Sequence, residues 1–251
     1  MTLNKLFLSA LLSILMLTTA CNQPQMGTPK ADLSTKLDSV SYALGYQNGT
    51  FLSREGITEL NMNNYNAGIG AGLSSEDGLL TQQEIQAVTN SYLQEITEKI
   101  SQDNLDEGQA FLEENKTKEG VMETESGLQY KVIEEGDGTS PSAQSTVRVH
   151  YVGELLDGTI FDTSRKDVAQ ANGLYNPQRE PYSGAEFPLN RVIPGWTEGV
   201  QLMNEGATYE FYIPSELAYG SRAPQGSKIG PNATLIFEVE LLEVKSPGSS
   251  N

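Results

Sequence analysis

The stretch that decides the fold of the second half of this chain is Leu156-Asp-Gly-Thr-Ile-Phe-Asp-Thr-Ser164. Its Asp-Gly dipeptide favours a tight hairpin turn. The residues before it, from Val147 to Val152, alternate in the way of a half-buried strand, with Tyr151 on the apolar face. Phe161 therefore returns opposite that strand, directly followed by the acid Asp162. No serine or cysteine nucleophile accompanies this pair, so the chemistry expected here does not involve a covalent intermediate.

Further strand-like segments surround this hairpin. They are 128–132, 186–189, 208–213 and 233–244. Pro194-Gly195 opens a short helix that carries Trp196, the only tryptophan. The polar residues from Arg165 to Gly184 contain several turn dipeptides, which predict a long irregular surface loop. Residues 121–245 are therefore expected to form an antiparallel sheet wrapped over one short helix, and the fold class of the chain is α+β.

The first half has helical periodicity instead. Two short amphipathic helices are expected between residues 33 and 73. Thr81-Gln-Gln-Glu84 then has the form of a capping box and starts a third helix that continues to about Lys116, with Gly108 as a candidate interruption. Unbroken, this helix has about 35 residues and a length of roughly 50 Å. Residues 33–120 are therefore predicted to be an all-α domain with a long connecting helix.

Two short helices do not cover so long a partner. The apolar stripe of the long helix, from Ile85 to Ile100, is expected to pack partly against a second copy of the chain, which predicts a homodimer through residues 33–120. In the second half of the helix glutamate and lysine predominate. There, a solvated stalk is an equal alternative to a packed surface.

The N-terminus has the features of an export signal. Lys5 precedes an apolar run from Leu6 to Leu17 that is too short to span a bilayer as a helix. Small residues then precede Cys21, the only cysteine, in an arrangement similar to a bacterial lipobox, although Leu17 lies one place further from the cysteine than usual. Residues 1–21 are thus expected to be a lipoprotein signal ending at a lipidated Cys21; a plain cleavage site is the alternative. Residues 22–32 are expected to form a flexible tether, and 246–251 a loose tail.

Charge and composition exclude several functions. The net charge is −17, which disfavours binding to nucleic acid, although an acidic surface often serves solubility alone. Neither a Cys/His cluster nor an EF-hand spacing is present, so no metal is expected. The only histidine, His150, falls on the strand face opposite Tyr151 and is predicted to be a partly exposed sheet residue and not a base.

Together, several motifs resemble the FKBP-type peptidyl-prolyl isomerases. They are Val149-His-Tyr-Val-Gly153, Asp157-Gly-Thr-Ile-Phe-Asp-Thr-Ser164, Val192-Ile-Pro-Gly-Trp196, Ala218-Tyr-Gly220 and Pro231-Asn-Ala-Thr-Leu-Ile-Phe-Glu-Val-Glu-Leu-Leu242. The first half is similar to the helical dimerisation segment of Mip-like members, through Ser41-Tyr-Ala-Leu-Gly-Tyr46 and Ser126-Gly-Leu-Gln-Tyr130. The resemblance covers nearly the whole chain after the signal.

The resemblance implies an apolar pocket for a prolyl residue. It assigns catalytic roles to Tyr151, Asp162 and Tyr219. It assigns substrate binding to Phe161, Phe187, Val192, Ile193, Trp196, Ile229 and Phe237. From pattern alone, several of these aromatic and aliphatic residues would be core, Asp162 a turn cap and Tyr219 a loop anchor.

Rotation about an X-Pro bond transfers no proton and needs no cofactor, since its barrier of about 18–20 kcal/mol arises from amide resonance. The leading hypothesis is a lipid-anchored, dimeric prolyl isomerase of the cell envelope, facing the periplasm, which binds proline-containing unfolded polypeptides and assists the folding of exported proteins. A chaperone-like holding module with little isomerase activity is the alternative. A purely structural envelope lipoprotein would not explain the pocket.

Three departures from the family pattern concern substrate preference more than the fold. The segment from Arg165 to Gly184 is longer than in compact members and is expected to border the pocket mouth. Lys228-Ile-Gly230 lacks the usual apolar first residue and the usual final proline, so that Ile229 alone keeps an apolar wall. Ala185 stands where many members have a larger side chain.

Overall fold

The computed structural model describes residues 30–74, 77–224 and 226–245. The predicted signal peptide, Cys21, most of the tether and the tail lie outside them. The chain divides into two compact units, and the boundary along the sequence falls between Phe51 and Leu52. None of the helices in the described part of the chain is both long enough and apolar enough to cross a membrane.

The first helix, α1 (Lys36–Arg54), runs across the division between the two units. Thr35 caps its start: the Thr35 hydroxyl accepts from the amide of Asp38 at 3.1 Å, and the Asp38 carboxylate accepts from the amide of Thr35 at 3.1 Å. Such reciprocal bonds satisfy amides that have no partner inside the helix. Most apolar residues of α1 are exposed, among them Leu37, Val40, Leu44 and Phe51.

The next helices are α2 (Met62–Ser74) and α3 (Gln82–Asn115). The predicted capping box is confirmed, because the Thr81 side chain accepts from the amide of Glu84 and the Glu84 side chain accepts from the amide of Thr81. The α3 helix has 34 residues and passes through Gly108 without a break. The candidate interruption at Gly108 is therefore wrong.

Gly108 instead allows α3 to lie close to the loop before the last strand. A Cβ atom at Gly108 would lie 2.3 Å from Oγ1 of Thr234. Further along α3, the Phe111 ring packs 5.9 Å from that of Tyr212, and the buried Asn115 amide donates to Oε1 of Gln129 at 3.0 Å. The second half of α3 thus packs along one face, and a stalk solvated all round is wrong for it.

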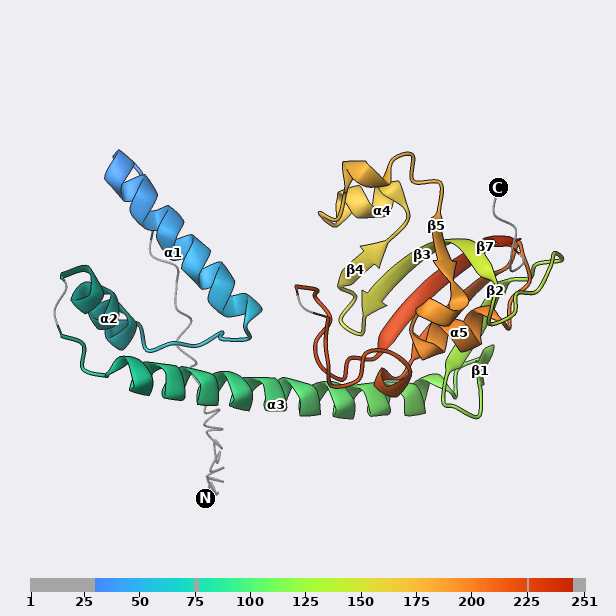
Figure 1. The fold of residues 1–251 in the computed structure, drawn as a ribbon, viewed down its shortest axis with the longest axis horizontal. Helices are drawn as coiled ribbons and strands as arrows, with labels where there is room; N and C mark the ends of the chain where they lie inside the picture. Colours follow the sequence, from blue (N-terminus) through green and yellow to red (C-terminus); the bar gives the residue numbers. More distant parts are fainter. Residues whose placement is uncertain (1–29, 75–76, 225, 246–251) are drawn as a thin grey trace, which may run out of the picture. The chain divides into compact units, whose positions relative to one another are not determined.

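The second unit also contains a seven-stranded antiparallel sheet (Figure 1). Its order is β1-β2-β6-β7-β3-β4, and β5 also pairs with β3. The strands are β1 (Val121–Glu123), β2 (Gln129–Glu134), β3 (Thr146–Leu155), β4 (Ile160–Thr163), β5 (Ala185–Pro188), β6 (Thr208–Ile213) and β7 (Leu235–Lys245). The predicted strands are confirmed, whereas the short β1 gives no periodic signal.

The short helix α5 (Pro194–Val200) packs against this sheet. Two of its glycines make the approach possible: a Cβ at Gly195 would lie 2.5 Å from the Ile213 side chain, and one at Gly199 would lie 2.7 Å from the Phe211 ring. Trp196 and Val200 of α5 join the core with the inward-facing residues of β3, β6 and β7. The α+β class and the arrangement of sheet and helix are as predicted.

The segment from Arg165 to Gly184 differs from the irregular loop that its composition predicts. It forms the helix α4 (Lys166–Ala171) and the 3-10 turn η1 (Pro177–Arg179). The turn dipeptides mark the edges of these elements. Asn172 caps the end of α4 before Gly173, whose φ is 70°, and the Asn176 side chain accepts from the amide of Gln178 at the start of η1. Two further 3-10 turns are η2 (Leu189–Arg191) and η3 (Ser215–Leu217).

Candidate active site

The β3–β4 hairpin brings an acid and an aromatic ring to one side of the sheet. Its turn is closed by the Leu155 amide, which donates to the carbonyl of Thr159 at 3.0 Å. A register shift between Gly153 and Glu154 bends the strand. Gly153 leaves room for two rings, because a Cβ there would lie 2.7 Å from both Phe161 and Phe237. The two rings meet edge to face, 5.4 Å between centroids.

Trp196 of α5 forms the floor of the site. Its ring meets those of Tyr151, Phe187 and Phe237 edge to face, at 5.5, 5.5 and 5.2 Å. Aromatic pairs in this geometry are favourable beyond their buried area. The Trp196 side chain is almost fully buried, and its Nε1 is the one buried side-chain polar atom without a hydrogen-bond partner among the residues that the structure describes.

These rings enclose an open cavity of about 460 Å³. All the pocket residues predicted from the sequence line it except Ile229, and Arg191 is a further lining residue. The complete lining is Tyr151, Phe161, Asp162, Phe187, Arg191, Val192, Ile193, Trp196, Tyr219 and Phe237. Ile229 is buried in the same hydrophobic cluster as Tyr151, Trp196 and Phe237, but it is not among the residues that line the cavity. The neighbouring Lys228 donates to the carbonyl of Ile160, just before Phe161.

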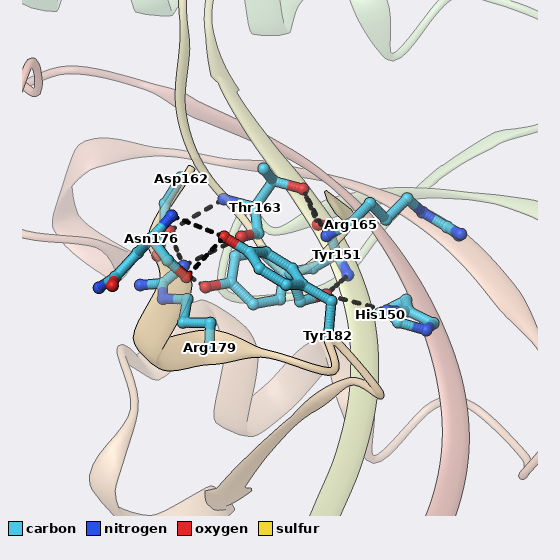
Figure 2. Close-up of polar contacts among 9 residues, drawn as sticks. His150, Tyr151, Asp162, Thr163, Arg165, Asn176, Arg179 and Tyr182 are labelled. Carbon is cyan, nitrogen blue, oxygen red and sulfur yellow. Dashed lines mark hydrogen bonds and ion pairs between the residues drawn. The ribbon is translucent and has the colours of Figure 1, made fainter. Parts of the chain in front are cut away.

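Asp162 is held by three donors. Its Oδ2 accepts from the Tyr151 hydroxyl at 2.6 Å, and its Oδ1 accepts from its neighbour's amide, that of Thr163, and from Arg179, both at 2.9 Å (Figure 2). Burial raises the pKa of the Tyr151 hydroxyl well above its ordinary value, and the Asp162 carboxylate raises it further. Tyr151 therefore stays protonated and donates to the carboxylate.

Arg179 is a residue that the sequence analysis missed. It lies at the end of η1, and its guanidinium also donates to the carbonyl of Thr163 at 3.0 Å. The hydrogen bond to Asp162 raises the pKa of Arg179, so its charge is permanent. No sequence motif indicates this contact, because it depends on how the segment between Arg165 and Arg179 folds back.

The segment from Arg165 to Gly184 is stabilised by a hydrogen bond within it and by two ion pairs to the sheet. The buried Tyr182 hydroxyl accepts from the amide of Asn176 at 2.8 Å, a bond visible in Figure 2. At its start, Arg165 pairs with Glu240 of β7 at 2.9 Å. At its end, Arg179 pairs with Asp162. The insertion is thus ordered and reaches the site through Arg179, although none of its residues lines the cavity.

Tyr219 lies in the loop after η3 and is 41% exposed. Burial of the remainder raises the pKa of its hydroxyl, and the Asp162 carboxylate adds to the rise. The hydroxyl is therefore a proton donor at the edge of the cavity. The loop that follows is closed at its base, where the amide of Asn232 donates to the carbonyl of Gly220 at 2.8 Å.

His150 lies outside the cavity lining, half-buried as predicted. Its Nδ1 is 3.2 Å from Oγ of Ser164, the atom that accepts the Tyr151 amide at 2.8 Å. Burial lowers the pKa of His150, and the nearby charge of Arg165 lowers it further. His150 thus supports the hairpin from the opposite face of the sheet.

The cavity combines an aromatic floor and walls with a few polar groups at its edge: the Asp162 carboxylate, the Tyr151 and Tyr219 hydroxyls and the Arg191 guanidinium. It is suited to an apolar ring of modest size whose flanking polar groups stay near the mouth. The Asp162 carboxylate is already engaged by donors of the protein itself.

Two family models match the sequence. One, described as FKBP-type peptidyl-prolyl cis-trans isomerase, matches residues 138–242, and the other, described as the domain amino terminal to FKBP-type peptidyl-prolyl isomerase, matches residues 37–132. Together they cover the helices, the sheet and the cavity.

Curated relatives and a solved structure agree with these matches. The FKBP-type 22 kDa peptidyl-prolyl cis-trans isomerase of Escherichia coli is 43% identical over 87% of this chain and 100% of its own length. The outer membrane protein MIP of Legionella longbeachae is 36% identical over 90% of this chain and 93% of its own length. The crystal structure of FkpA from Escherichia coli is 32% identical, with a TM-score of 0.59, and covers 86% of this chain and 100% of that one.

Proposed function

The chain belongs to the FKBP-type peptidyl-prolyl cis-trans isomerases, and we propose that it accelerates rotation about X-Pro bonds in the cavity walled by Tyr151, Phe161 and Phe237 and floored by Trp196. It is an enzyme of protein folding that binds proline-containing peptides, as this family does. The relatives are named as isomerases, which favours catalysis over the holding of unfolded chains.

The observation that carries the mechanism is the aromatic enclosure around a cavity with few polar groups. A planar prolyl amide has more charge separation than a twisted one, because resonance is lost as the C–N bond rotates. An apolar enclosure therefore disfavours the planar ground state more than the twisted state. Only such a difference between the two states increases the rate.

The roles of individual residues follow from their positions. The Trp196 floor and the rings of Phe161 and Phe237 would hold the pyrrolidine ring. The Tyr219 hydroxyl, protonated and partly exposed, would donate to a substrate carbonyl. Asp162 would fix the Tyr151 hydroxyl and place its remaining negative potential beside the rotating amide.

The experiment measures the rate of cis-to-trans isomerisation of a short proline peptide with the full chain and with its Tyr219→Phe variant. Tyr175→Phe is the matched control, because Tyr175 is also 41% exposed but lies outside the cavity lining. We expect catalysis by the unaltered chain, a fall of about two- to tenfold in kcat/KM for Tyr219→Phe, the size of one lost hydrogen bond, and no change for the control. Absence of catalysis by the unaltered chain would contradict the proposal.

The location and assembly of the enzyme are part of the proposal. A relative named as an outer membrane protein supports a place in the cell envelope, where the lipobox-like sequence ending at Cys21 would supply a lipid anchor facing the periplasm. Exposed apolar residues on α1, α2 and the first half of α3 support dimerisation through residues 33–120, with residues 121–245 as the isomerase domain. Mass spectrometry of the mature N-terminus tests the anchor, since an unmodified Cys21 in membrane fractions would rule it out.

A further inference from the structure

Arg191 is an exposed cation on the wall of the cavity. It ends η2, directly before Val192 and Ile193, which also line the cavity. Within residues 30–74, 77–224 and 226–245, no carboxylate pairs with it and no side-chain hydrogen bond engages its guanidinium. By contrast Arg179, the other arginine at the cavity, pairs with Asp162.

The charged side chains at the cavity leave one positive charge without an acidic partner. The lining contains one acid, Asp162, and one base, Arg191. The charge of Asp162 is already matched by Arg179, at 2.9 Å. One positive charge therefore remains at the mouth, in a chain whose net charge is −17. Arg191 therefore lacks an acidic partner although the chain as a whole is strongly acidic.

The guanidinium has a fixed fork of donors that fits a carboxylate in two parallel hydrogen bonds. Its neighbours on the cavity wall, Val192 and Ile193, are apolar, but Arg191 itself is exposed, so the ion pair is expected to have the modest strength of a surface pair. A backbone carbonyl would satisfy one of these donors but not the charge.

We propose that Arg191 is a specificity-determining residue that pairs with the carboxylate of an Asp or Glu flanking the substrate proline, so that the enzyme prefers acidic prolyl peptides. This inference rests on the proposed isomerase function of the cavity. The ion pair would form with a side chain of the substrate and not with the rotating amide itself, so we expect it to contribute about equally in the planar and twisted states. Uniform binding of this kind lowers KM and leaves kcat unchanged.

The test uses the full chain and two pairs of peptides, with Glu or Gln directly before the proline and with Glu or Gln directly after it. The variants are Arg191→Gln, Arg191→Lys and Arg191→Glu. Lys99→Gln is the charge-matched control, because Lys99 lies on α3, outside the cavity lining. Glutamate and glutamine have nearly the same size, so each pair isolates the charge.

We expect kcat/KM to be about two- to fivefold higher for the glutamate peptide in one of the pairs, the size expected of an exposed ion pair. The preference should reside in KM, disappear in Arg191→Gln, persist in Arg191→Lys, and reverse in favour of the glutamine peptide in Arg191→Glu. The control should keep the preference of the unaltered chain.

Equal rates on glutamate and glutamine in both pairs, or a preference that Arg191→Gln retains, would overturn the inference. Either result leaves the isomerase function intact, because that function is judged by turnover of the glutamine peptides. If no peptide is isomerised by the unaltered chain, the proposed function itself fails, and a binding measurement with the same peptides then decides the preference.

Discussion

The Tyr151 hydroxyl donates a 2.6 Å hydrogen bond to Oδ2 of Asp162, whose other oxygen accepts from Arg179. The carboxylate is thus shared between the cavity wall and the insertion that follows β4. A group at the reacting centre is positioned by residues on two separate elements. Substitutions at Tyr151 and Asp162 therefore test the hydrogen bond between them.

Asp162→Asn should lower kcat/KM on a short proline peptide by about tenfold, the size of one charge-assisted hydrogen bond, while circular dichroism shows an unchanged fold. Tyr151→Phe should have a similar effect. Because the two side chains share one hydrogen bond, the double variant should lose less than the product of the single losses. Strictly multiplicative losses would show that the two residues act separately. Asp137→Asn, an exposed acid, is the control.

Gly153→Ala should destabilise the protein and damage the site together. The new methyl group would lie 2.7 Å from the rings of both Phe161 and Phe237, so the rings must move. Overpacking of this kind costs about 1–3 kcal/mol. Urea unfolding should show a lower midpoint with an unchanged slope, and kcat/KM should fall. Gly158→Ala is a comparison with open space around the new methyl group, although its φ of 80° disfavours a side chain.

Gly108→Ala should lower the stability of the chain although alanine favours helix by about 1 kcal/mol. The added Cβ would lie 2.3 Å from Oγ1 of Thr234. Thr234→Ala removes that oxygen, and the double variant should recover part of the loss. Gly49→Ala in α1 has open space and should be neutral or stabilising. A stabilising Gly108→Ala would show that α3 and the loop at Thr234 are not held this closely in solution.

The free energy of unfolding should fall as the pH is lowered below about 6.5, in part because of His150. Burial and the charge of Arg165 lower the pKa of His150 in the folded chain, and Arg148 adds a smaller effect, while Glu240 and a hydrogen bond with Ser164 oppose them. The unfolded chain therefore binds more protons from the ordinary pKa of 6.5 down to the lowered value, and stability is lost across that window. In His150→Gln this contribution should vanish. Parallel pH curves for the two proteins would contradict the assignment.

The dimer through the first half predicts that Val88→Glu yields monomers in sedimentation experiments. Val88 is 56% exposed within one chain, and a buried glutamate without a partner would be costly at an interface. Asn90→Glu adds the same charge on another face of α3 and should leave the dimer intact. A Val88→Glu protein that sediments as the unaltered one does would place the interface elsewhere.

The sequence predicted the parts of the fold that depend on local pattern. Alternation placed Tyr151 on an inward strand face, the Asp-Gly turn returned Phe161 beside it, and Thr81 with Glu84 marked the start of α3. Gly108 was misjudged because helix propensity records the cost of glycine but not the close neighbour, Thr234, that makes glycine necessary.

The parts of the site that escaped prediction depend on tertiary contacts. Arg179 reaches Asp162 only because α4 and η1 fold the insertion back, and nothing periodic in the sequence records such a path. Ile229 was expected on the wall; it belongs to the same buried cluster as the cavity rings but does not line the cavity. Arg191 was passed over because a charged residue before Val192 looks like ordinary surface until its neighbours are known.

The two arginines at the ends of the insertion have a wider consequence. Arg165 is anchored to Glu240 of β7 and Arg179 to Asp162 of β4, so the insertion is tied to the sheet at two points. We expect that the residues between Arg165 and Arg179 can be replaced by another sequence while these two ion pairs are kept. A different segment grafted between Arg165 and Arg179 would give the enzyme a new recognition surface at its entrance while the rotation chemistry stayed the same.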